Sequence, residues 1–354
     1  MRRKPSFKFE RARLFVDLFK RQSSKATDHI EFNFKAYMHK CPPPKKALNT
    51  WLKAYGTIEN ENYGHLLLEQ IGKGDEALRD ALRPYFESAH QDAREYFHKR
   101  IGISLHPDGK LPQTVAYPNC LPSKALRGLF GEVIAGLVTE AYQEEFVGGY
   151  AWQVPIFLFR EHDDVEKYLW SLRYDKKRVR EIYGRHGTDF VGIALDGAGE
   201  VVRVIAGEAK WRKTLTPSAV STLLYGPKVE NEETGKKEYS NKGIWYEVNR
   251  DSVIPHGLRQ MQFLLQLRDP EGHASTILSI DRAVLAEEPE LERTDLVVIS
   301  GNGAASRDTG DSLIGWQEIP QEYEAGRDLQ IVEVILKDGD SLIDSLYGSL
   351  WSDD

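Results

Sequence analysis

The sequence predicts an α/β protein in which a mostly helical N-terminal region precedes a sheet flanked by helices. Two observations predict this division of the 354 residues. Over residues 1–120, most apolar side chains recur at the spacing of one helix face. Beyond residue 150, short apolar runs bounded by glycine are typical of strands. We therefore expect a helical region over 1–120 and an α/β domain over 121–354.

The N-terminal region contains four segments with a helical signal and ends in a connection that marks a boundary. Residues 12–22 place Leu14, Phe15, Leu18 and Phe19 on one helix face. After two prolines, 45–55 again shows helical spacing, and a further segment spans 62–71. Asp75 has the side chain of an N-cap, so we expect a helix from there to residue 100. The connection 106–119 contains proline and glycine and marks the boundary to the second region.

The second region alternates helices and strands. A helix over 124–145, capped by Ser123, is expected before a strand over 152–159 and a basic helix over 163–183. Strands over 190–196 and 201–211 are joined by a glycine turn, which predicts a hairpin. Later elements are a polar surface insertion at 226–243, a helix over 255–268, strands over 296–300 and 331–336, and a final helix.

Composition excludes several classes of protein. Apolar residues make up 41% and charged residues 29% of the chain, as in globular proteins. No apolar run approaches the roughly 18 residues of a membrane helix, and the basic N-terminus lacks the apolar core of a secretory signal. The two cysteines have neither disulfide-framework nor zinc spacing, so we expect a cytoplasmic protein. A net charge of −7 argues against a protein that coats nucleic acid along its whole surface.

The predicted hairpin carries the most informative residues. Asp189 opens its first strand, and Glu208 and Lys210 close its second. Residues two apart on a strand leave the same face, and a hairpin places the start of one strand beside the end of the other. We therefore expect the three side chains to meet. Two carboxylates suit Mg²⁺ or Mn²⁺, and an ammonium group beside them suits phosphodiester hydrolysis.

The pattern Asp189…Glu208-Ala209-Lys210 resembles the motif of the PD-(D/E)xK nuclease superfamily, although Thr188 stands in place of the motif's proline. The resemblance covers about residues 123–225. It implies a restriction-endonuclease-like core with a central mixed sheet, and it implies that Asp189, Glu208 and Lys210 are catalytic. The helix before the sheet carries Glu132, which matches a glutamate that often helps hold the metal in this family. The resemblance thus implies metal ligation by Asp189, Glu208 and Glu132.

Basic residues on both sides of the motif predict contacts with nucleic-acid phosphates. The stretch 173–186 has a local charge balance of +4 and runs directly into the motif. His186, close to Asp189, is a weaker candidate, since a loop hydrogen bond explains such a residue as well. The residues expected to bind nucleic acid are Lys176, Lys177, Arg178, Arg180, Arg185, Arg212 and Lys213.

The predicted function is Mg²⁺-dependent cleavage of DNA. The layout resembles stand-alone nuclease subunits of bacterial phage-defence systems, including the Hachiman type, which implies a helicase or other ATPase partner; a second copy of the chain is a further expected partner. Three alternatives stay open. The fold can serve as a catalytically silent adaptor for nucleic acid or a partner. The Lys/Glu pair can belong to a metal-free enzyme, or the charged residues can simply cap strands.

Overall fold

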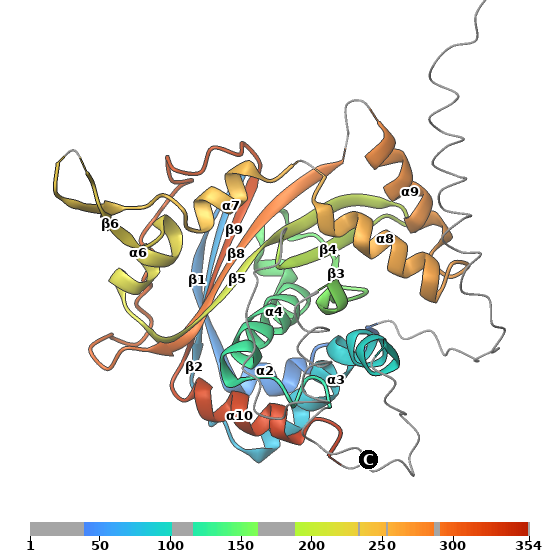
Figure 1. The fold of residues 1–354 in the computed structure, drawn as a ribbon, viewed down its shortest axis with the longest axis horizontal. Helices are drawn as coiled ribbons and strands as arrows, with labels where there is room; N and C mark the ends of the chain where they lie inside the picture. Colours follow the sequence, from blue (N-terminus) through green and yellow to red (C-terminus); the bar gives the residue numbers. More distant parts are fainter. Residues whose placement is uncertain are drawn as a thin grey trace, which may run out of the picture. The chain divides into compact units, whose positions relative to one another are not determined.

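A seven-stranded mixed sheet runs through the computed structural model of this chain (Figure 1). The structure describes residues 39–100, 116–161, 188–232, 234–252, 254–286 and 291–352, all within one compact unit from Tyr37 to Asp354. The strand order is β1-β2-β9-β8-β5-β4-β3. The strands are β1 (Leu52–Asn60), β2 (Tyr63–Gln70), β3 (Trp152–Gln153), β4 (Phe190–Leu195), β5 (Val201–Leu215), β8 (Glu292–Gly303) and β9 (Asp328–Leu336).

The middle of the sheet is parallel and its two ends are antiparallel. Strands β2, β9, β8 and β5 run parallel to one another, whereas β1 is antiparallel to β2, β4 to β5 and β3 to β4. Parallel strands are usually covered by helices on both faces. Accordingly, all eight residues of β2 are buried, as are eight of the nine residues of β9. The prediction of an α/β protein with a mixed sheet flanked by helices is confirmed at this level.

One face of the sheet is covered by a helical layer. Its helices are α2 (Lys45–Trp51), α3 (Glu76–Arg100), α4 (Ser123–Ala141) and α10 (Gly339–Ser349), which lie together in Figure 1. Helix α4 is the central one, because twelve of its residues are buried and it packs on β5. Its core cluster includes Ile205 and Ala209 of β5 and Phe190 of β4.

The opposite face is covered by two groups of helices. Helices α6 (Pro217–Tyr225) and α7 (Ile244–Arg250) pack near β8 and β9, and a hairpin of β6 (Lys228–Glu230) and β7 (Lys237–Tyr239) follows α6. Helices α8 (His256–Arg268) and α9 (Ala274–Leu285) pack on β4 and β5, against Val191, Val204 and Ala206. None of the helices in the described part of the chain is long and apolar enough to cross a membrane.

The expectation of a mostly helical region over 1–120 is wrong for residues 52–70. The helix expected over 45–55 ends at Trp51, and the chain continues as β1 and β2. Strand β2 pairs with β9, so these residues share one sheet with the expected α/β domain. For β2, full burial on both faces removes the two-residue alternation that identifies a half-exposed strand, which explains the error over residues 63–70. Helix α3 begins where expected, and Asp75 Oδ1 accepts from the Leu78 N–H at 3.1 Å.

Smaller corrections concern the elements near the hairpin. The strand expected over 152–159 is limited to Trp152–Gln153, because Pro155 has no N–H for a sheet ladder. The N-cap of α4 is Pro122, not Ser123. Helices α6, α7 and α9 were not expected, and the exposed insertion at 226–243 contains the β6–β7 hairpin. The segments expected at 12–22 and 163–183 lie outside the described residues.

Candidate active site

The β4–β5 hairpin brings Asp189 beside Glu208. Its turn is fixed by Asp196, whose Oδ1 accepts from the N–H groups of Ala198 and Glu200, both at 2.9 Å. The register then pairs Phe190 with Gly207, which places the preceding and following residues next to each other. The hairpin and the adjacency of Asp189 and Glu208 are therefore as the sequence predicts.

Lys210 joins the two carboxylates in one ionic cluster. Its Nζ donates to Asp189 Oδ2 and to Glu208 Oε2, each at 2.5 Å. The Glu208 side chain is 8% exposed and that of Asp189 is 19% exposed, whereas Lys210 keeps 34% of its side chain in solvent. The cluster thus consists of two carboxylates with little exposure to solvent and a partly exposed ammonium group. Its formal charge is −1.

Two backbone features hold this cluster in place. Strand β4 begins at Phe190, so the Ala209 N–H lies beyond the ladder, and it donates instead to Asp189 Oδ2 at 3.3 Å. On the other side of β5, Gly207 permits close approach of β8. A Cβ at Gly207 would lie 1.7 Å from the Leu296 carbonyl oxygen, so no larger residue fits without moving a strand. The residue before Glu208 is therefore constrained by backbone contact.

The charges in the cluster shift each other's protonation. Burial, reinforced by the negative charge of Asp189 and partly opposed by Lys210, raises the pKa of Glu208 to about 8. Burial lowers the pKa of Lys210, but the charges of Asp189 and Glu208 raise it by more, so the net shift is upward. Lys210 therefore stays protonated at neutral pH, and a cation more highly charged than ammonium would favour ionised Glu208.

The cluster lies on the face of the sheet opposite to α4. Along β5, Val204 and Ala206 pack against α8, whereas Ile205 and Ala209 pack against α4. Glu208 and Lys210 follow Val204 and Ala206 in steps of two residues, so their side chains leave the same face as these two. Helix α4 carries Glu132, whose side chain is buried. Burial raises the pKa of Tyr347 on α10, and the charges of Tyr117 and Glu132 raise it further. The structure thus brings Asp189, Glu208 and Lys210 together and places Glu132 in the helical layer behind them.

A pocket of about 190 Å³ opens beside Glu208. Thr188, Gly207 and Glu208 of the hairpin line one part of it, and the rest of the lining comes from α7, the residue after it and β8. Charged groups of both signs are among these residues. They are Glu247, Arg250, Asp251 and Arg293. None of the four was predicted from the sequence.

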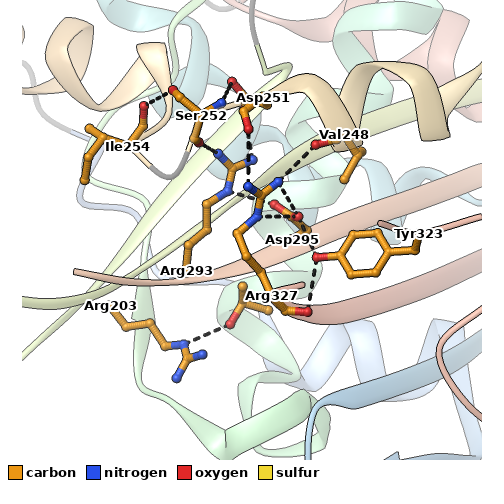
Figure 2. Close-up of polar contacts among 10 residues, drawn as sticks. Arg203, Val248, Asp251, Ser252, Ile254, Arg293, Asp295, Tyr323 and Arg327 are labelled. Atoms are coloured by element: carbon orange, nitrogen blue, oxygen red, sulfur yellow. Dashed lines mark hydrogen bonds and ion pairs between the residues drawn. The ribbon is translucent and has the colours of Figure 1, made fainter. Parts of the chain in front are cut away.

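A buried ionic network fixes the wall of this pocket (Figure 2). Asp295 of β8 is fully buried and accepts from Arg293 Nε at 2.7 Å, Arg327 Nε at 2.8 Å and the Tyr323 hydroxyl at 2.7 Å. Arg293 continues to the Ser252 carbonyl at 2.5 Å and to Asp251 at 2.8 Å. Arg293 and Asp295 lie two residues apart at the start of a buried strand. Opposite charges at such positions are the sequence signal that could have predicted this network.

Of the predicted nucleic-acid contacts, the described residues include two. Arg212 and Lys213 are both exposed near the end of β5. Arg212 continues the alternation of Glu208 and Lys210, so it leaves the face of the cluster, whereas Lys213 lies where the register between β5 and β8 becomes irregular. Lys176, Lys177, Arg178, Arg180, Arg185 and His186 lie outside the described residues.

The donor set of the cluster fits a hard divalent cation. Since both carboxylate oxygens lie 2.5 Å from one nitrogen, they are at most about 5 Å apart, and the two carboxyl groups are close enough to hydrogen bond to each other. One Mg²⁺ needs oxygens within about 4.2 Å of each other, from two bonds of about 2.1 Å. The described residues contain no group of three or more His, Cys, Asp or Glu side chains placed to hold a metal ion. Asp189 and Glu208 therefore provide two carboxylates for such an ion, and the metal-binding role of Glu132 stays a prediction.

Comparison with protein-family models and with the sequences of curated proteins gives no match to this chain. The function of this chain is therefore inferred from the geometry of the cluster and its pocket.

Proposed function

We propose that this protein is a metal-dependent nuclease that hydrolyses phosphodiester bonds, with DNA as its substrate. The observation that carries the proposal is the convergence of the Asp189 and Glu208 carboxylates on the Lys210 ammonium beside a pocket. Carboxylate pairs of this kind hold Mg²⁺ or Mn²⁺ through oxygen alone. When bound, such an ion supplies Lewis-acid chemistry, which polarises a phosphate oxygen and favours ionisation of water.

The residues of the chain have distinct roles in this proposal. Asp189 and Glu208 would hold the ion, and burial of Glu208 strengthens its attraction to the ion because the local dielectric is low. Lys210 now lies between the two carboxylates. A divalent ion there would displace its ammonium towards solvent, where the side chain is already partly exposed. An ammonium in that position stabilises negative charge that develops on the phosphate.

An adaptor without catalysis is the second candidate function. The observation that favours it is that Lys210 already satisfies both carboxylates, as it would in a purely structural ion cluster. Against it, a buried cluster maintained only for stability is replaceable by apolar residues at little cost. The two candidates differ in one measurable property, which is cleavage that depends on a divalent metal.

The deciding experiment incubates the protein with plasmid, linear and single-stranded DNA in Mg²⁺, Mn²⁺ or EDTA. We expect metal-dependent cleavage that Asp189→Asn abolishes. Asp196→Asn is the matched control, because the same substitution at the turn of the same hairpin keeps the acceptor for Ala198 and Glu200 and leaves the cluster untouched. Equal cleavage by both variants, or none by the parent protein under any condition, would refute the proposal.

The cellular role extends the proposal further. We propose action in bacterial defence against phage in the cytoplasm, together with a helicase or other ATPase subunit, on the resemblance of the motif and layout alone. Co-purification of the chain with such a subunit, and loss of protection in cells that carry Asp189→Asn, would test this role directly.

A further inference from the structure

Helix α7 carries an exposed aromatic ring beside the candidate active site. The Tyr246 side chain keeps 46% of its surface in solvent, although tyrosine is a large and partly apolar residue. The guanidinium carbon of Arg250 lies 4.8 Å from the centre of its ring. Residues four apart on a helix are neighbours on its surface, so the helix itself holds Arg250 and Tyr246 in a cation–π contact.

The buried side of α7 fixes the direction in which this pair points. Ile244, Trp245 and Val248 are buried in the core under the helix, and Trp245 packs 5.6 Å from Trp316. Arg250 lines the pocket that also contains Glu208. Tyr246 therefore lies one helical turn beyond the rim of that pocket, with Arg250 between it and the cluster.

Further ring and cation contacts continue on the neighbouring elements. Helix α6 packs against α7, and Tyr225 at its end lies 5.5 Å from Tyr239 of the β6–β7 hairpin. Lys228 of the same hairpin lies 4.9 Å from the centre of the Tyr239 ring. In Figure 1 the hairpin projects away from the sheet on the side of α6 and α7. Aromatic side chains thus lie on α7, on α6 and on the hairpin that follows α6.

The charges of α7 and the β6–β7 hairpin do not favour electrostatic attraction of phosphates. Arg250 is paired with Glu247 at 2.5 Å, and Asn231 of the hairpin turn donates to Glu238. Over residues 228–250 the five basic residues are matched by five glutamates. Because the net charge is zero, this segment offers little electrostatic attraction to phosphates, and the contribution it does offer is stacking on the exposed ring.

We propose that Tyr246, with Arg250 over its ring, is a stacking platform for an unpaired base, and that the substrate is single-stranded where it enters the pocket. This inference rests on the proposed nuclease function, because it names the substrate class of the same site. Every base presents a stacking face, so aromatic platforms bind single strands without strong sequence preference. The bases of a duplex are already stacked on each other and gain nothing from an exposed ring.

The test measures binding separately from cleavage. Fluorescence anisotropy follows a labelled single-stranded oligonucleotide of about 15 nucleotides, and the corresponding duplex, on the full chain carrying Asp189→Asn. In this background, Tyr246→Ala should weaken single-strand binding by roughly tenfold, since one stacked base contributes about that factor or more. Tyr246→Phe should keep the affinity because the ring remains. Phe263→Ala on α8 is the matched control, since Phe263 is 52% exposed and lies away from the pocket.

A spectroscopic signature distinguishes stacking from a general loss of structure. A single-stranded oligonucleotide containing 2-aminopurine should lose fluorescence on binding, and Tyr246→Ala should restore it while its unfolding midpoint stays at the parent value. Unchanged single-strand affinity in Tyr246→Ala, or an equal loss for duplex, overturns the inference even if the parent protein cleaves DNA. If Tyr246-dependent binding is seen but no cleavage occurs in any metal, the platform stands and the nuclease proposal fails.

Discussion

The Lys210 ammonium and the Asp189 carboxylate face each other across two antiparallel strands, with Nζ 2.5 Å from Oδ2. This contact exists only because the β4–β5 hairpin has its observed register, in which Phe190 pairs with Gly207. A slip of one residue would turn Glu208 and Lys210 to the face of α4 and separate them from Asp189. The turn at Asp196 and the ion cluster at the far end therefore specify the same hairpin.

Asp189→Asn should abolish cleavage and leave binding of nucleic acid intact or tighter. The amide keeps the size of the side chain and an acceptor oxygen for the Ala209 N–H, but it removes a charge that a hard divalent ion requires. Isothermal titration with Mn²⁺ measures the metal affinity, and a DNA-binding assay measures the affinity for nucleic acid. Metal affinity equal to that of the parent protein would show that Asp189 is not a ligand.

Lys210→Ala should retain the metal and lose rate. Ammonium is not a metal ligand, so the titration with Mn²⁺ should still show binding. The cleavage rate at saturating metal should fall by two or more powers of ten, about 3 kcal/mol or more. Lys213→Ala, an exposed lysine three residues further on the same strand, should cleave like the parent protein. A rate for Lys210→Ala within a few fold of the parent would assign Lys210 to stability alone.

Glu132→Gln should leave the metal affinity of the cluster nearly unchanged. Helix α4 lies on the other face of the sheet, and independent sites usually affect each other by no more than about 0.5 kcal/mol. The same titration with Mn²⁺ measures the difference. A loss of affinity that raised metal concentration rescues would instead support the role that the family resemblance implies for Glu132.

Arg212→Ala should weaken DNA binding more than Lys213→Ala does. Both residues are exposed and adjacent in sequence, but only Arg212 continues the regular alternation that places Glu208 and Lys210 on the face of the cluster, since Lys213 lies in the irregular part of the register. Loss of one phosphate contact should reduce the slope of log affinity against log salt by about 0.9. Anisotropy titrations at several salt concentrations measure that slope. Identical slopes for the two variants would mean that DNA does not follow this face of β5.

Stability should fall as the pH drops from about 6.5 towards 4 because of His98. This ring is fully buried and accepts from the Tyr117 N–H at 2.9 Å, and burial lowers its pKa from 6.5 to about 4. The unfolded chain therefore binds the proton first, which destabilises the fold by up to about 3 kcal/mol over that interval. Urea unfolding across the interval should show the loss. His98→Gln, which offers an acceptor but cannot titrate, should show a shallower dependence on pH.

The hairpin and its ionic cluster could be predicted from the amino-acid sequence, because both depend on local rules. Glycine and Asp196 fix a tight turn, and the two-residue alternation of a strand then places Glu208 and Lys210 on one face. The same rules identified α3, α4, α8 and β9. Asp75 at the start of α3 and the proline before α8 are local signals that act within one turn of helix.

Long-range packing sets which strands are buried on both faces and which side of the sheet each residue faces. Residues 63–70 form a strand because β9 and two layers of helices surround them, and no local pattern records that environment. The side of the sheet on which Glu132 lies depends on which face of β5 receives α4. The pocket wall at Arg250 and Arg293 joins segments about 40 residues apart, through an ionic network whose partners are distant in sequence. Contacts between segments this far apart are set by the packing of the whole sheet, and the pattern of a single sequence does not show them.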